Sequence, residues 1–121
     1  MKFIADTSVW IDHIRKPDVG LSTLLLERRV LVHPVILGEM SCGNFARRLE
    51  ILGNLKLLPC ARIASFEEAM ELIESKKLYG AGLDFSDIQI IAAALLSDAG
   101  ILTRDKSMLL AMKRLQIKKP Q

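Results

Sequence analysis

The chain has few of the residues that build metal sites from sulfur and nitrogen. Among its 121 residues are two cysteines and two histidines. Cys42 and Cys60 stand far apart without a CxxC pattern, and we expect both to be buried as small apolar side chains. His13 and His33 belong to no HxxxH or HExxH pattern. These absences argue against a zinc site.

Long apolar runs are also missing. The longest, residues 90–96, is far shorter than the roughly 20 residues that a membrane-spanning helix needs. An acid at Asp6 interrupts the start of the chain, which therefore lacks the apolar core of a secretion signal. We expect a cytoplasmic protein that has no membrane partner.

Aromatic residues make up only 5% of the chain. This is too few for the stacking platforms on which many single-strand-binding proteins hold bases. The formal net charge is +3 and the isoelectric point is near 9.0. A nucleic acid, if one binds, would therefore be held through its phosphates more than through its bases.

Apolar residues, by contrast, are abundant, at 50% of the chain. A length of 121 residues suits one domain, residues 1–121, with a single core. So high an apolar share in a small domain suggests that a partner covers part of its surface.

Strands and helices are predicted to alternate along the chain. The expected strands are 2–5, 30–32, 101–103 and an edge strand that begins at Ile117. The expected helices are 9–14, 21–28, 34–40, 45–55, 66–78, 87–96 and 106–115. Capping boxes are expected at Ser65 with Glu68 and at Ser86 with Gln89. The alternation favours an α/β fold: a three-layer α/β/α sandwich around a central, mostly parallel sheet.

Four acids lie where such a sheet would bring them together. Asp6 follows the first expected strand and Asp105 follows the strand at 101–103. Asp87 starts the helix that precedes that strand, and Glu39 lies on the helix after the second strand. The carboxyl ends of parallel strands share one edge, where ligands gather. We expect the four carboxylates to approach a common point there.

Each acid also has a simpler interpretation. Asp6, Asp87 and Asp105 can cap helices or complement helix dipoles, and Glu39 can be an exposed helical residue. Together, however, clustered carboxylates in apolar segments raise one another's pKa unless a cation is present. All-oxygen ligation points to Mg²⁺ or Mn²⁺. Ser8 would orient Asp6 or hold a water, or would simply start a helix.

These residues resemble the PIN-domain family, and within it the VapC-type toxins of toxin–antitoxin pairs. Members begin with a hydrophobic strand ending in D-T/S-S/N, carry a glutamate after the second strand, a D-x-x-I-x-A-x-A helix, and T-x-D after a late strand. The matching positions, in the same order, are Asp6-Thr7-Ser8, Glu39, residues 87–94, and Thr103-Arg104-Asp105. Members often have an aromatic residue after the last acid, where this chain has Ser107-Met108.

The resemblance covers the whole chain and implies a Mg²⁺-dependent ribonuclease that a cognate antitoxin holds inactive. Asp6, Glu39, Asp87 and Asp105 would be the acidic quartet that binds the metal and catalyses cleavage. Asp84 is expected to be a loop residue and is kept as a substitute for one of the four. A homodimer is also expected.

Arg15, Lys16 and Arg104 are the candidates for contacts with RNA phosphates, because they lie in loops or helix ends near the proposed edge. The alternative for each is an ordinary solvated side chain. The stretch Tyr79-Gly80-Ala81-Gly82 lacks the third glycine of GxGxxG and is not interpreted as a nucleotide-binding loop.

Two other classes of protein share part of this pattern. A receiver-type phospho-accepting domain has two adjacent acids after the first strand, whereas here hydroxyl residues follow Asp6. A non-catalytic interaction module would use all four acids as caps. Its contact surface would be the apolar helices at 21–26 and 45–58, which in a nuclease would instead receive an antitoxin helix or a second subunit.

Overall fold

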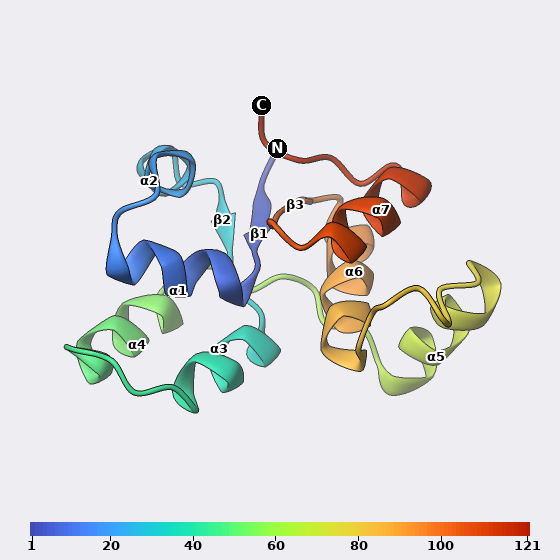
Figure 1. Ribbon diagram of the computed structural model, residues 1–121, viewed down its shortest axis with the longest axis horizontal. Helices are drawn as coiled ribbons and strands as arrows, with labels where there is room; N and C mark the ends of the chain where they lie inside the picture. Colours follow the sequence, from blue (N-terminus) through green and yellow to red (C-terminus); the bar gives the residue numbers. More distant parts are fainter.

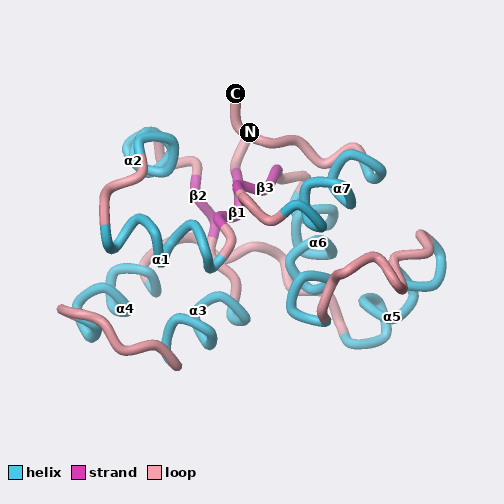
Figure 2. Tube along the Cα trace, viewed as in Figure 1, coloured by secondary structure: helices cyan, strands magenta, loops and turns pink.

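A computed structural model describes residues 1–121 and has a small parallel sheet between two groups of helices (Figure 1). The strands are β1 (Phe3–Ala5), β2 (Val30–Leu31) and β3 (Gly100–Leu102). β1 is central and pairs in parallel with both neighbours, in the order β2-β1-β3. Figure 2 shows how short the strands are beside the helices that surround them.

Seven helices complete the fold. They are α1 (Thr7–Arg15), α2 (Val19–Leu26), α3 (Pro34–Ser41), α4 (Arg48–Lys56), α5 (Phe66–Ser75), α6 (Phe85–Ser97) and α7 (Lys106–Leu115). In Figure 1 the first four lie on one side of the sheet and the last three on the other. The expected three-layer α/β/α sandwich with a parallel sheet is thus confirmed. No helix has both the length and the apolar character needed to cross a membrane.

The main core is a cluster of 23 buried apolar residues around the sheet and α6. All three residues of β1 are buried, as is typical of a parallel strand covered on both faces. On α6 the run Ile90–Ala94 is buried without interruption, so this helix packs closely against the strands. The burial of β1 and α6 fixes the position of the residues that follow β1 and precede β3.

Backbone pairing continues one residue beyond β1. The Asp6 backbone N–H donates to the Leu102 carbonyl at 2.9 Å, next to the paired Ala5 and Leu102. Asp6 and Thr103 therefore leave the sheet side by side. Helix α1 begins directly after Asp6, and α7 begins directly after Asp105.

Two helices begin elsewhere than the sequence indicates. The helix expected at 45–55 is α4, which begins at Arg48, and its preceding residue makes no side-chain cap. The helix expected from Asp87 begins at Phe85, because the capping box is formed by Asp84 and Asp87 and not by Ser86 and Gln89. The capping box at Ser65 and Glu68 is confirmed, although α5 ends at Ser75.

Two further expectations were wrong. No strand forms at Ile117; the segment contributes one backbone hydrogen bond to β3, from Ile101 N–H to the Lys118 carbonyl at 2.9 Å. Cys42 and Cys60 are both exposed, because Cys42 ends α3 and Cys60 lies in the loop after α4.

Gly100 has no room for a side chain. A Cβ at this position would lie 2.4 Å from the Phe3 ring and 2.4 Å from the Lys118 carbonyl oxygen. At Gly53, within α4, a Cβ would have no atom within 4 Å apart from the backbone of its own helix. The two glycines therefore differ in packing and form a matched pair for substitution.

We expect Gly100→Ala to lower the free energy of unfolding by about 1–3 kcal/mol, because the added methyl group forces β3 away from Phe3. Gly53→Ala should raise it by up to about 1 kcal/mol, since alanine favours a helix. Urea unfolding of the two variants and the parent measures both changes. Equal effects of the two substitutions would contradict the close packing at β3.

Candidate functional site

A polar depression of about 490 Å³ lies at the carboxyl edge of the sheet. Its eight lining residues are Asp6, Thr7, Ser8, Asp12, Glu39, Asp87, Arg104 and Asp105, and none of them is hydrophobic. All four predicted acids and Ser8 line this acidic depression. They come from the β1–α1 junction, from α3, from α6 and from the β3–α7 loop.

Asp6 is held by two hydrogen bonds. Its Oδ1 accepts the Thr7 backbone N–H at 2.8 Å, as an N-cap of α1, and its Oδ2 accepts the Thr103 hydroxyl at 3.0 Å. The same Thr103 oxygen accepts the Asp105 backbone N–H at 3.1 Å. Thr103 is buried, so this one hydroxyl joins the loops that carry two of the acids.

Glu39 is exposed on α3 and reaches the N-terminus of α1. Its Oε1 accepts the Thr7 hydroxyl at 2.8 Å. The start of α3 is capped by buried His33, whose Nδ1 accepts the Val35 backbone N–H at 3.0 Å. Burial lowers the pKa of His33, which favours the neutral ring that this acceptor role requires.

Asp87 is the third residue of α6 and exchanges hydrogen bonds with Asp84, the N-cap of that helix. Asp84 Oδ1 accepts the Asp87 N–H at 2.8 Å, and Asp87 Oδ2 accepts the Asp84 N–H at 3.1 Å. Burial, with the charges of Asp84, Asp6 and Asp105, raises the pKa of Asp87 to about 6, although the hydrogen bond from Asp84 N–H opposes the shift. The carboxylates are thus close enough to repel one another.

Asp105 is the N-cap of α7, where its Oδ1 accepts the Ser107 N–H at 2.8 Å. The capping interpretation of Asp6, Asp87 and Asp105 is therefore correct, but it does not exclude a role in a site. Asp105 Oδ2, Asp87 Oδ1 and Glu39 Oε2 accept no hydrogen bond within the chain. Each of these three acids keeps one oxygen for a ligand.

The donors in the acidic depression are of the type that binds hard cations. They are carboxylate and hydroxyl oxygens. The lining has no sulfur or nitrogen ligand, because the Arg104 guanidinium is a cation and cannot bind a metal ion. In the observed rotamers no three acid, histidine or cysteine side chains are placed to hold a metal ion. The donor chemistry of the site therefore suits a hard divalent cation, although the acids are not arranged around one in these rotamers.

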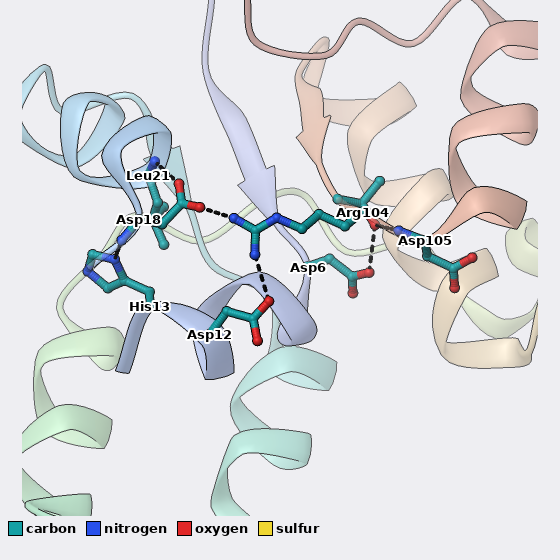
Figure 3. A network of polar contacts seen from close by, with 8 residues as sticks. Asp6, Asp12, His13, Asp18, Leu21, Arg104 and Asp105 are labelled. Atoms are coloured by element: carbon teal, nitrogen blue, oxygen red, sulfur yellow. Dashed lines mark hydrogen bonds and ion pairs between the residues drawn. The ribbon is translucent and has the colours of Figure 1, made fainter. Parts of the chain in front are cut away.

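Arg104 closes the depression on the side of α1 and α2 (Figure 3). Its guanidinium pairs with Asp12 at 2.6 Å and also with Asp18. Asp18 in turn accepts the Leu21 N–H at 2.8 Å as the N-cap of α2, and its own N–H donates to His13 Nδ1 at 2.9 Å. Arg104 thus links the β3–α7 loop to α1 and α2.

Of the three predicted phosphate contacts, Arg104 lines the acidic depression and the other two lie beside it. Arg15, Lys16 and Arg104 line a second depression of about 410 Å³ together with Asp12 and Asp18. Only Arg104 and Asp12 line both depressions. Asp84, the substitute candidate, does not line the acidic depression, because its carboxylate caps α6.

Sequence reasoning missed the site roles of Asp12, Thr7 and Thr103. Asp12 lies four residues after Ser8 on α1, a spacing that places both on one face of the helix and indicates its position. Thr7 and Thr103 flank predicted acids, but their hydroxyl partners lie 32 and 97 residues away in the chain. Only the folded structure identifies those partners.

The class of protein follows from a comparison of the whole chain with known families and structures. Residues 3–114 match the family described as PIN domain, so the chain belongs to the PIN-domain family. The crystal structure of PAE2754 from Pyrobaculum aerophilum has a similar fold, with a TM-score of 0.61 at 14% identity. That likeness covers 91% of this chain and 78% of the other. Membership in this family decides against a receiver-type domain.

Within the family the chain is of the VapC type. It is 34% identical over 107 residues to Ribonuclease VapC32 of Mycobacterium tuberculosis, in two strains, CDC 1551 / Oshkosh and ATCC 25618 / H37Rv. The match covers 85% of this chain and 84% of the relative. The resemblance identified from four short motifs is thereby confirmed.

We expect the stability of the metal-free protein to decrease as the pH rises between about 4 and 7. The pKa of Asp87 is about 6 in the folded protein against an ordinary 3.8. Between these values the folded state keeps a proton that the unfolded chain has released. The resulting stabilisation is complete below the lower pKa and is lost as the pH passes the higher one.

Asp87→Asn removes this titration and keeps an oxygen for the Asp84 N–H. Urea unfolding in the presence of a chelator should therefore show the parent losing stability relative to Asp87→Asn across this pH range. Glu71→Gln, which removes an exposed acid of α5, controls for the loss of one charge. If the difference in unfolding free energy between the parent and Asp87→Asn stays constant across this pH range, the raised pKa of Asp87 is contradicted.

Proposed function

We propose that this chain is a divalent-metal-dependent endoribonuclease, the toxin of a toxin–antitoxin pair that acts on RNA in the cytoplasm as a single domain of residues 1–121. The observation that carries the proposal is a depression lined by five carboxylates, the four predicted acids and Asp12, without apolar residues, at the carboxyl edge of a PIN-domain sheet. The ribonuclease name of the VapC32 relatives supports the same activity.

Asp6, Asp87 and Asp105 would hold Mg²⁺ or Mn²⁺, with Glu39 as a further ligand or as the base that orients the attacking water. A cation bound there lowers the pKa of a water and offsets the charge that develops on the phosphate. The unpaired oxygens of Asp87, Asp105 and Glu39 support this assignment. Because Asp6 uses both oxygens in hydrogen bonds, it would also have to accept the cation on a second lone pair.

The hydroxyl groups of the site orient the acids. Thr103 fixes one oxygen of Asp6, and Thr7 fixes one oxygen of Glu39. These two hydrogen bonds restrict the rotation of the Asp6 and Glu39 carboxylates. Ser8 lines the same depression and is a further group that can orient a water.

We expect Asp6→Asn to abolish RNA cleavage while the fold remains intact. The fall in rate should exceed about 100-fold, because even groups that only support metal ligands contribute about 10- to 100-fold. Calorimetric titration with Mg²⁺ or Mn²⁺, followed by incubation with total RNA, measures binding and cleavage in the parent and the variant. Asp98→Asn, at the far end of α6, is the matched control. Normal turnover by folded Asp6→Asn would refute the assignment, and absence of metal binding in the parent would favour the non-catalytic interaction module.

Arg15, Lys16 and Arg104 are proposed to contact RNA phosphates from the α1 side of the site. Of the three, only Arg104 also lines the acidic depression. Its pairing with Asp12 and Asp18 fixes the direction of the guanidinium. The guanidinium carries five N–H donors, so those that do not bond to the two acids can still donate to a phosphate.

Arg104→Gln should raise KM for RNA roughly tenfold and leave kcat less affected, because a contact with a flanking phosphate stabilises substrate and transition state alike. Initial rates over a range of RNA concentrations separate the two constants. Arg47→Gln is the control, since Arg47 is also exposed and pairs with one acid, Glu50, at 2.5 Å. A fall in kcat alone would place Arg104 in the chemical step instead.

The antitoxin and a second subunit are proposed to bind apolar side chains that the fold leaves exposed. Leu26 at the end of α2 is 86% exposed, and Leu49 and Leu57 on α4 and just after it are 81% and 83% exposed. The sequence analysis predicts that both partners bind these two segments. Buried neighbours such as Leu52 and Leu55 belong to the core and do not contribute to such a surface.

A further inference from the structure

Positive charge is concentrated in the last part of the chain. Residues 104–121 contain six basic residues, which are Arg104, Lys106, Lys113, Arg114, Lys118 and Lys119, and one acid, Asp105. The chain as a whole has 17 basic and 14 acidic residues. The excess of charge therefore lies on α7 and the segment that follows it.

The four lysines among these residues line one depression of about 840 Å³ on α7. The lysines are Lys106, Lys113, Lys118 and Lys119, and we call this surface the lysine track. Its apolar lining consists of Leu109, Leu110, Met112 and Ile117. No acidic side chain lines the depression, and none of the four lysines forms an ion pair. Their charge is thus available to an anion.

The lysine track begins one residue after the last of the four acids. Lys106 directly follows Asp105 in the chain. Lys106, Leu110 and Lys113 lie on one face of α7 at spacings of four and three residues. The two lysines are about 10 Å apart along the helix axis. A polyanion that follows this face therefore leads to or from the carboxylates.

The segment after α7 is held beside the helix by the backbone. Ile117 N–H donates to the Met112 carbonyl at 2.9 Å, and the Lys118 carbonyl accepts the Ile101 N–H at 2.9 Å. Figure 1 shows α7 leaving the sheet edge and the last residues running back toward the N-terminus. Lys118 and Lys119 therefore stand next to α7 and extend the basic surface.

The lysine track leaves the site at the start of α7 and runs to the amino ends of the strands, where Lys118 and Lys119 lie near Phe3. In Figure 3, Asp12, Asp18 and the guanidinium of Arg104 lie to one side of Asp6, and Asp105 at the start of α7 lies to the other. Arg15 and Lys16 line the depression on the first side. The carboxylates thus have basic residues on both sides, so that a bound chain can extend past the site in both directions.

We propose that the lysine track binds the sugar–phosphate backbone of RNA on the α7 side of the cleaved bond, so that substrate runs through the site and is cut within the chain. This inference rests on the proposed ribonuclease function. Uncompensated lysines beside the acids favour a polyanion, and the scarcity of aromatic residues favours phosphate contacts over base stacking. An acidic protein segment is the competing occupant, and the test below distinguishes it.

The test compares two triple variants of equal net charge, each in the non-cleaving Asp6→Asn background. The track variant carries Lys113→Gln, Lys118→Gln and Lys119→Gln. The control variant carries Arg28→Gln, Lys56→Gln and Arg62→Gln, three exposed residues whose side chains form no ion pair and line none of the three depressions discussed. Lys106 is left unchanged because it adjoins Asp105.

Fluorescence anisotropy with a labelled single-stranded RNA of about 12 nucleotides, at several salt concentrations, measures the affinity. The slope of log K against log salt should decrease in magnitude by about two units in the track variant, because each phosphate contact contributes about 0.7. The control variant should keep the parent slope. Binding of a trinucleotide, too short to reach beyond the site, should be the same in both variants.

An unchanged slope in the track variant, or an equal change in both variants, would overturn the proposal. If the slope is unchanged and the track substitutions abolish binding of poly-glutamate, the surface is instead assigned to an acidic protein. Lys113→Gln alone, with an expected change of about 0.7 units, repeats the test if the triple variant does not fold.

Activity separates this inference from the proposed function. In the chain with Asp6 intact, the three lysine substitutions should raise KM for the longer RNA and leave kcat unchanged. If the parent chain cleaves RNA and the three lysine substitutions leave its KM unchanged, only the lysine-track proposal is refuted. If the parent chain does not cleave RNA with Mg²⁺ or Mn²⁺, the proposed function is refuted, and the anisotropy result alone decides whether the lysine track binds RNA.

Discussion

Repulsion between carboxylates is the constraint on which the architecture of this protein depends. Parallel pairing of β1 with β3 brings Asp6 and Asp105 to the same edge, and α6 adds Asp87. Each of these acids lies at the N-terminus of a helix, where backbone N–H groups and the helix dipole favour negative charge. The caps thereby offset part of the repulsion. Burial, together with the charges of Asp84, Asp6 and Asp105, still raises the pKa of Asp87.

Apolar burial provides the precision that this arrangement needs. The strands are only two or three residues long, yet Ile4 and Ile101 are paired across the sheet and completely buried. A slip of one residue in a strand would turn these side chains to the opposite face. It would also separate Asp6 from the Thr103 hydroxyl. The register that buries the core is therefore the register that assembles the site.

The sequence predicted the elements and the acids because both depend on local patterns. Apolar runs that end in an acid mark Asp6 and Asp105, and the helices at α5 and α7 follow from their caps and spacing. The start of α6 was misplaced because Ser86 with Gln89 and Asp84 with Asp87 both match a capping box. Which box forms depends on where the preceding loop enters the helix, and this is set by packing rather than by the motif.

Contacts between distant parts of the chain lay beyond sequence reasoning. Arg104 pairs with Asp12 across 92 residues, and Thr103 bonds to Asp6 across 97. No local pattern identifies such partners. The sequence therefore predicted that Arg104 lies near the sheet edge but did not identify the acids with which it pairs. The exposure of Cys42 and Cys60 could not be predicted for the same reason, because burial depends on which helix ends the core covers.

Charge separation in the folded protein couples its two proposed ligands. The acids lie in the middle, with basic residues on the α1 side and on α7. RNA phosphates are attracted from both sides but repelled at the centre as long as the carboxylates are uncompensated. A cation at the centre removes that repulsion, and a phosphate there in turn strengthens the binding of the cation. By thermodynamic linkage each ligand must increase the affinity for the other by the same factor. The acids that make the site costly without a metal thus make metal and RNA binding mutually dependent.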